Sequence, residues 1–181
     1  MASATWAIAL PKLGILLPVS FAVSPRVPPM RQVWRYVQAA LGVIFRHPIT
    51  GITVVPVLDD GQIVLVRRRD DGRWSLPGGI VDWGEDVRTT LQRELAEETG
   101  LEVQSIGRLV GVYSAPQRDA RFHSICLAIE ARARGTLEVQ DVLELAEVKA
   151  FPPDALPPLD DLSQDHGQQL RDYFDGKTVV S

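Results

Sequence analysis

The chain has 181 residues, of which 45% are hydrophobic and 23% are charged, and its formal net charge is −4. These values indicate one ordinary soluble domain with enough apolar residues for a core, and the weak negative charge argues against a nucleic-acid partner. The single cysteine, Cys126, excludes an internal disulfide and suits a reducing compartment, so we expect a cytoplasmic protein. Because Cys126 lies in an apolar run, we expect a buried and unreactive thiol.

The first part of the chain carries no acidic residue before Asp59, and residues 1–29 are apolar and rich in proline. A secretory signal is disfavoured, because no basic residue precedes the apolar run and prolines and a lysine interrupt it. The run is also marginal in length for a membrane span. We therefore predict a poorly ordered extension over residues 1–29, with Met30 as an alternative initiator.

Residues 31–45 read RQVWRYVQAALGVIF, with apolar side chains gathered on one helical face, and Pro48 follows shortly after. This pattern predicts an amphipathic helix over residues 30–46. Its apolar face can dock on the rest of the protein or on a membrane surface, and docking is the commoner outcome. We thus expect no firm membrane association, and a folded domain over residues 47–181.

Strand and turn patterns follow from residue 50 onward. Residues 50–58 are rich in β-branched side chains, residues 59–61 read Asp-Asp-Gly, and residues 62–68 form a second strand, which together predict a hairpin. Further strands are predicted over residues 105–113, 122–131 and 147–151, and a last helix over residues 162–174. Strands interspersed with helices indicate an α/β layer architecture.

The segment from 86 to 99 contains neither glycine nor proline, its apolar residues recur at helical spacing, and Gly100 provides a stop. On this predicted helix Glu94, Glu97 and Glu98 stand at positions i, i+3 and i+4, so the three carboxylates share one face. Three crowded negative charges repel unless cations neutralise them, and oxygen ligands at this density suit Mg²⁺ or Mn²⁺. The residues therefore predict metal-dependent phosphoryl or pyrophosphoryl chemistry, with a solvated, salt-bridged face as the alternative.

Residues 79–101, GIVDWGEDVRTTLQRELAEETGL, match the pattern of the Nudix box: Gly, five residues, Glu, seven residues, Arg-Glu-aliphatic-x-Glu-Glu-x-Gly-aliphatic. The matching positions are Gly79, Glu85, Arg93, Glu94, Leu95, Glu97, Glu98, Gly100 and Leu101. The chain therefore resembles a Nudix hydrolase. The resemblance implies an α/β/α sandwich with a mixed β-sheet over about residues 49–176.

The resemblance also implies site residues. The catalytic set is Glu85, Arg93, Glu94, Glu97 and Glu98, and the metal set is Gly79, through its carbonyl, with Glu94, Glu97 and Glu98 around Mg²⁺ or Mn²⁺. Arg93 is expected to bind Glu85 and to fix the loop against the helix. The general base varies across the family and is left open, and Glu144 and Glu147 lie where many members carry a further glutamate. Members are often homodimers, and they cleave a diphosphate linked to another group.

Residues 111–127, GVYSAPQRDARFHSICL, bear on the choice of substrate. Pro116 follows Gly100 by sixteen positions, similar to the spacing associated with ADP-ribose pyrophosphatases. Residues 118–121 read RDAR and resemble the RDPR of many ADP-ribose hydrolases, with alanine in place of proline. Arg118 and Arg121 can each hold a phosphate by a charge-assisted fork, and a solvated loop with a salt bridge to Asp119 is the alternative.

Arg67, Arg68 and Arg69 end a predicted strand close to the box, and alternation sends at least one of them to the opposite face. Arg68 is taken as the candidate for a contact with substrate phosphate. Three aromatic residues could stack on a base or ribose, although core packing is the commoner role. They are Trp74, Trp83 and Tyr113.

The predicted substrate is a small nucleotide: ADP-ribose or a related nucleoside diphosphate sugar, hydrolysed to AMP and a sugar phosphate. An alternative with the same chemistry is a pyrophosphatase of nucleoside triphosphates, including oxidised ones. A third alternative is a regulator that binds ADP-ribose without cleaving it, and the intact set of glutamates argues against it.

Overall fold

A computed structural model describes residues 34–37, 47–119 and 122–181. The chain divides into two compact units, residues 1–46 and 47–181, and each is described by itself. In the first unit, residues 34–37 are helical and exposed. The rest of the helix predicted over 30–46 and the extension predicted over 1–29 lie outside the described residues. No helix in the described part of the chain is long and apolar enough to cross a membrane.

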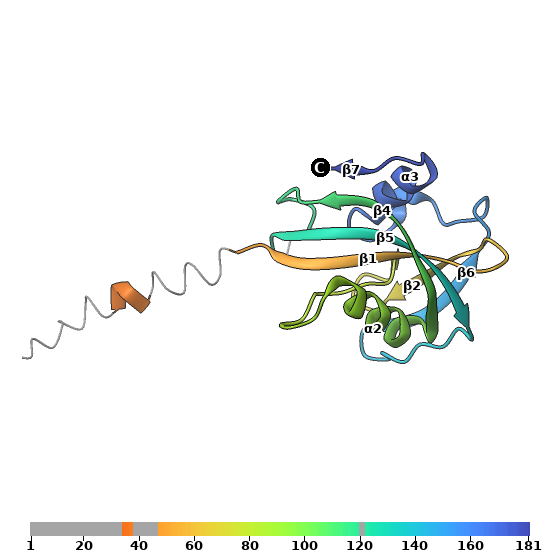
Figure 1. Ribbon diagram of the computed structural model, residues 1–181, viewed down its shortest axis with the longest axis horizontal. Coiled ribbons are helices and arrows are strands. Elements are labelled where there is room, and N and C mark those ends of the chain that lie inside the picture. Colours follow the sequence, from red (N-terminus) through yellow and green to blue (C-terminus); the bar gives the residue numbers. More distant parts are fainter. Residues whose placement is uncertain (1–33, 38–46, 120–121) are drawn as a thin grey trace, which may run out of the picture. The chain divides into compact units, whose positions relative to one another are not determined.

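The second unit contains a mixed β-sheet (Figure 1). Its strands are β1 (Ile49–Val57), β2 (Ile63–Arg68), β3 (Trp74–Ser75), β4 (Leu101–Tyr113), β5 (Ser124–Gly135), β6 (Leu145–Phe151) and β7 (Val179–Val180). Within the described residues the order is β3-β2-β1-β5-β4-β7, and β6 pairs with β2. Strand β1 runs parallel to β5 at the centre, whereas β4 runs antiparallel to β5.

The predicted hairpin between β1 and β2 is present, because these strands pair antiparallel at Val57 and Ile63. The longer partner of β2 is nevertheless β6, which pairs with it from Ile63 opposite Phe151 to Arg68 opposite Leu145. Strand β2 thus diverges from β1 beyond the turn. This divergence carries the arginines at the end of β2 away from the central strands.

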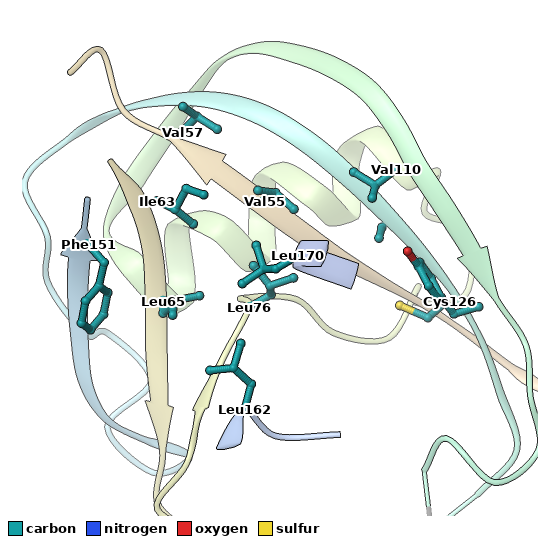
Figure 2. Packing of buried hydrophobic residues seen from close by; sticks show 12 residues of the cluster. Val55, Val57, Ile63, Leu65, Leu76, Val110, Cys126, Phe151, Leu162 and Leu170 are labelled. Carbon is teal, nitrogen blue, oxygen red and sulfur yellow. The ribbon is translucent and has the colours of Figure 1, made fainter. Parts of the chain in front are cut away.

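The sheet lies between α2 (Val87–Thr99) and α3 (His166–Phe174), with a short 3-10 helix η1 (Leu159–Asp161) before α3 (Figure 1). Successive residues of β1 face opposite sides of the sheet, and the strand is buried on both sides. Ile52 and Val54 pack in the cluster that contains Leu91 and Leu95 of α2. Val55 and Val57 pack in the cluster that contains Leu162 and Leu170 (Figure 2). The predicted α/β/α sandwich with a mixed sheet is confirmed.

Helix α2 begins and ends where its sequence predicts. The Asp86 carboxylate accepts a hydrogen bond of 2.8 Å from the Thr89 amide, which caps the first turn. Gly100 adopts a left-handed conformation, with φ of 74°, and closes the last turn. These two caps fix the span of the helix that carries the three glutamates.

Helix α3 begins four residues later than predicted, at His166 instead of residue 162. Residues 159–161 form η1, and Gln164 has φ of 52°, a left-handed conformation that an α-helix cannot contain. The prediction was wrong at this end because the apolar spacing continues back to Leu162, which packs in the core without being helical.

Candidate active site

A cleft of about 400 Å³ opens between the two helical layers. One wall carries Glu94, Glu97 and Glu98 of α2, and β1 contributes to the floor. The other wall comes from the loop before β5 and from the segment that leads into α3, including Arg118 and Gln164. The three carboxylates predicted to share a helix face therefore line one wall of a cleft, together with Asp141 and Glu144 from the loop before β6.

Two glycines in the turn after β3 bring its backbone close to β1 and to the glutamates. Gly78 has φ of 150°, a β-carbon there would lie 2.2 Å from the Ile52 carbonyl oxygen, and its amide donates a 2.8 Å hydrogen bond to Glu98. A β-carbon at Gly79 would lie 2.1 Å from Oε1 of Glu94. The Gly79 carbonyl accepts a hydrogen bond from the Ile52 amide at 2.9 Å. A side chain at Gly78 would clash with the β1 backbone and one at Gly79 would displace the Glu94 carboxylate, and the Gly78 amide holds Glu98 against the turn.

Arg93 joins the loop before α2 to the glutamate face. Its Nε and Nη2 donate to the Glu85 carboxylate at 3.1 and 3.0 Å, the contact that the resemblance implies. Its Nη1 donates to Glu94 at 2.8 Å and to Glu97 at 3.3 Å. The hydrogen bonds from Arg93 and Thr90 lower the pKa of Glu85. One guanidinium thus donates hydrogen bonds to three carboxylates and offsets part of their charge.

Burial distinguishes the glutamates. Glu98 is buried, and burial raises the pKa of its carboxyl to about 8, with a further contribution from neighbouring Glu94 and an opposing one from the Gly78 amide. Burial also raises the pKa of Glu94, although Arg93 opposes this. Glu97 is more exposed, at 54% of its side chain. Two carboxylates are therefore held in an environment that disfavours their negative charge.

The donor set at this wall fits a hard cation, because it offers several carboxylate oxygens and a peptide carbonyl within one acidic wall. Among the described residues, no three or more His, Cys, Asp or Glu side chains are arranged to hold an ion as they stand. Arg93 engages one oxygen of Glu94 and one of Glu97. An ion that bound at these two oxygens would have to replace the guanidinium.

The three consecutive arginines at the end of β2 have different environments. Arg68 lines the cleft and forms a fork with Asp70, with distances of 2.9 and 2.7 Å. Arg67 pairs with Glu147 at 3.7 Å, and neither side chain lines the cleft. Arg69 donates to the carbonyl oxygens of Val142 and Leu145, each at 2.9 Å, and anchors the loop that carries Glu144. Of the two further glutamates considered, Glu144 lies at the site and Glu147 does not.

Arg118 lines the cleft but is already engaged by protein groups. Its Nε and Nη2 form a fork with the Asp165 carboxylate at 2.9 and 2.7 Å, and its Nη1 donates to the Ser124 hydroxyl at 2.6 Å. Only 6% of its side chain is exposed, which contradicts a solvated loop at this residue. The arrangement also differs from the predicted fork on phosphate, since a carboxylate holds that position. Arg121 lies outside the described residues.

The comparisons with known proteins agree with this geometry. The family model described as the NUDIX domain matches residues 47–173. The chain belongs to the Nudix hydrolase family. It is 34% identical over 135 residues to an ADP-ribose pyrophosphatase of Methanocaldococcus jannaschii. The matched region covers 72% of this chain and 76% of that protein. The chain is 32% identical over 131 residues to the "Putative 8-oxo-dGTP diphosphatase" of Bacillus subtilis, covering 72% and 83%.

A solved structure of an ADP-ribose pyrophosphatase from Streptococcus suis aligns with a TM-score of 0.58 and 27% identity, covering 75% of this chain and all of that one. This Nudix hydrolase is accordingly a pyrophosphatase. The names of its relatives divide between ADP-ribose and oxidised-nucleotide substrates at similar identity, so they do not choose between the two.

The Nudix hydrolase also contains buried polar contacts that the sequence did not indicate. The Thr53 hydroxyl donates to the Gln169 side chain at 2.6 Å, and the Gln169 amide donates to Asp165 at 3.0 Å. Cys126 lies 3.5 Å from the Thr53 hydroxyl, and burial raises the pKa of its thiol, as expected for an unreactive cysteine. Asp165 follows Arg118 by 47 residues, so no local pattern could have linked them.

The three aromatic residues considered for stacking on a base or ribose lie in different environments. Trp74 packs edge to face on Phe151, with ring centroids 5.0 Å apart. The Tyr113 hydroxyl donates to Asp172 at 2.9 Å in the core. Trp83 is fully exposed and follows Asp82, which lines the cleft of this Nudix hydrolase. Core packing thus explains Trp74 and Tyr113, and Trp83 remains the candidate for stacking.

His166 is a buried imidazole whose Nδ1 accepts a 3.0 Å hydrogen bond from the Leu76 amide. Burial lowers the pKa of His166 to about 4; Asp165 and Asp71 oppose this, whereas Arg118 and Arg68 add to it. Between pH 6.5, the ordinary pKa of the side chain, and about pH 4, the unfolded chain takes up a proton at His166 and the folded protein does not. The free energy of unfolding contributed by His166 is therefore retained above pH 6.5 and lost as the pH falls toward 4.

The free energy of unfolding is expected to fall by about 3 kcal/mol across this pH interval. Urea unfolding at a series of pH values, on the wild type and on His166→Asn, measures it. The asparagine oxygen can still accept from Leu76 but does not titrate. A steeper fall for the wild type than for the variant is expected, and parallel curves would contradict the assignment.

Proposed function

We propose that this chain is a divalent-metal-dependent pyrophosphatase of ADP-ribose or a related nucleoside diphosphate sugar, which releases AMP and a sugar phosphate. The observation that carries the proposal is the acidic wall of Glu94, Glu97 and Glu98. The opposite wall of the same cleft also contains residues that are not acidic. A diphosphate can bind at the first wall while the groups attached to it extend toward the second.

The proposed ligands of Mg²⁺ or Mn²⁺ are the Gly79 carbonyl and the carboxylates of Glu94, Glu97 and Glu98. When bound, the ion neutralises charge on the diphosphate and lowers the pKa of a bound water. The Glu98 carboxylate accepts a hydrogen bond from the Gly78 amide, which fixes one of its oxygens against the turn after β3. One of the cleft-lining glutamates accepts the proton of the attacking water, and Glu144 belongs to that group of candidates.

Arg93 and Glu85 act in this proposal as a clamp on the loop before α2, because the same guanidinium also donates to the Ile80 carbonyl at 3.3 Å. Arg68 is proposed to contact a substrate phosphate, which would replace the exposed Asp70 carboxylate as its partner. Arg118 is proposed to position the loop before β5 through Asp165 and Ser124, in place of the direct phosphate contact expected from the sequence.

A second candidate function is a pyrophosphatase of oxidised nucleoside triphosphates. It is favoured by the Bacillus subtilis relative at 32% identity, whose name refers to 8-oxo-dGTP. The ADP-ribose proposal has support from the Methanocaldococcus jannaschii relative and the Streptococcus suis structure, together with the position of Pro116 after Gly100. The two functions share the acidic wall and differ in what the other wall binds.

A hydrolysis panel with Mg²⁺ separates the candidates. ADP-ribose, other nucleoside diphosphate sugars, dinucleotides, and canonical and oxidised triphosphates are each incubated with the protein, and the products are separated by chromatography. We expect the highest kcat/KM for ADP-ribose or a related sugar, with AMP as a product. Preferred release of pyrophosphate from a triphosphate would overturn the ADP-ribose proposal in favour of the second candidate.

A further inference from the structure

Gln164 is the one non-glycine residue with a positive φ among the described residues, at 52°. The left-handed region is favourable for glycine and tolerable for asparagine, whereas a longer side chain such as glutamine is disfavoured there. Gln164 also lines the cleft, in the wall opposite the glutamates. An unfavourable backbone conformation thus coincides with a position at the site.

The residues on both sides of Gln164 fix this conformation. The Ser163 amide donates to the Trp74 carbonyl at 2.8 Å, and the Ser163 hydroxyl donates to Asp71 at 2.7 Å. On the other side, Asp165 is held by Arg118, and His166 accepts from the Leu76 amide. Such strain persists where the surrounding structure determines the backbone from both directions, and it is concentrated at functional sites.

The side chain of Gln164 has no structural task that explains its presence. It is exposed, and its amide has no hydrogen-bond partner in the described part of the chain. Glycine would fit the backbone better and would keep the contacts of Ser163 and Asp165. The amide is therefore available to a molecule bound in the cleft.

The surroundings of Gln164 indicate what that molecule presents. Ile49 and Phe122 line the cleft and offer apolar surface, and Gln164 adds one donor and one acceptor. A planar nucleobase combines an apolar face with a polar edge, and a glutamine amide matches the adenine edge with two hydrogen bonds. We propose that Gln164 is a specificity-determining residue whose amide hydrogen-bonds the polar edge of the nucleobase. This inference rests on the proposed function.

Gln164→Gly tests the proposal, because the structural and the functional role predict different results. The melting temperature of the full chain should stay equal or rise, since glycine relieves the backbone. Calorimetry with AMP, GMP and UMP should give one preferred base for the wild type. The variant should bind that nucleotide about three- to tenfold more weakly, with the preference between bases reduced by the same factor.

Gln168→Ala is the matched control, because Gln168 is an exposed glutamine of α3 that does not line the cleft. It should leave the affinities unchanged. Unchanged affinities in Gln164→Gly, equal weakening for all three bases, or no preference in the wild type would each overturn the assignment to the nucleobase. Failure of the proposed function is distinguishable, since it appears as absent hydrolysis of diphosphate sugars by the wild type, whatever the nucleotide affinities are.

Discussion

Replacement of Glu98 by glutamine is expected to lower kcat/KM on the preferred substrate by roughly a hundredfold or more while the protein stays folded. The variant loses a carboxyl group that can ionise against the proposed metal, and it keeps an oxygen that can accept a hydrogen bond from the Gly78 amide. Burial raises the pKa of this carboxyl, so its charged form is disfavoured in the folded protein. A neutral side chain of the same shape should therefore leave the melting temperature unchanged or raise it.

The measurement combines steady-state hydrolysis with thermal unfolding, each with and without Mg²⁺. The wild type should melt at a higher temperature when Mg²⁺ is present, and Glu98→Gln should lose most of that increase. Glu102→Gln is the matched control, because Glu102 lies on β4 with 78% of its side chain exposed and does not line the cleft. Full turnover in Glu98→Gln would contradict the metal-binding proposal.

Arg118→Ala is expected to destabilise the folded protein by about 3–5 kcal/mol, because it leaves the largely buried Asp165 carboxylate without an opposite charge. The pair is largely buried, with 6% and 21% of the two side chains exposed, and the guanidinium also binds Ser124. Had Arg118 contacted only substrate phosphate, the same substitution would raise KM and leave stability unchanged. Urea unfolding without substrate separates these two roles.

Arg134→Ala is the control for this experiment, since Arg134 is 65% exposed and pairs with Glu102 at 4.0 Å. Exposed pairs of this kind contribute about 0–1 kcal/mol. The double variant Arg118→Ala/Asp165→Ala should be more stable than the sum of the two single effects predicts, because neither charge is then left alone. A loss in Arg118→Ala no larger than that in Arg134→Ala would show that the fork with Asp165 does not stabilise the fold.

The sequence predicted the elements whose signals are local. Asp86 and Gly100 mark the ends of α2, and the spacing of Glu94, Glu97 and Glu98 places their carboxylates on one face, because a helix relates such positions directly. The same local signals could not predict β3 and β7, which have two residues each and are too short to show alternation. They exist because neighbouring strands β2 and β4 supply their hydrogen-bonding partners.

The second wall of the cleft could not be predicted for a different reason. Asp165 meets Arg118 of the loop before β5 through the tertiary fold, and this contact changes the role expected for Arg118. An arginine near a proline of suggestive spacing is compatible with either a phosphate or a carboxylate partner. Only the packing of α3 against the sheet decides which partner is present.

The two walls of the cleft belong to opposite layers of the sandwich, supported by separate hydrophobic clusters on the two faces of the sheet. The glutamates depend on the packing of α2, whereas Gln164 and Asp165 depend on the segment that leads into α3. An exchange of residue 164 alone therefore keeps the residues beneath the glutamates in place, together with the contacts of Ser163 with Trp74 and of His166 with Leu76. Such exchanges offer a route to altering which nucleotides are cleaved while the cleavage machinery is kept.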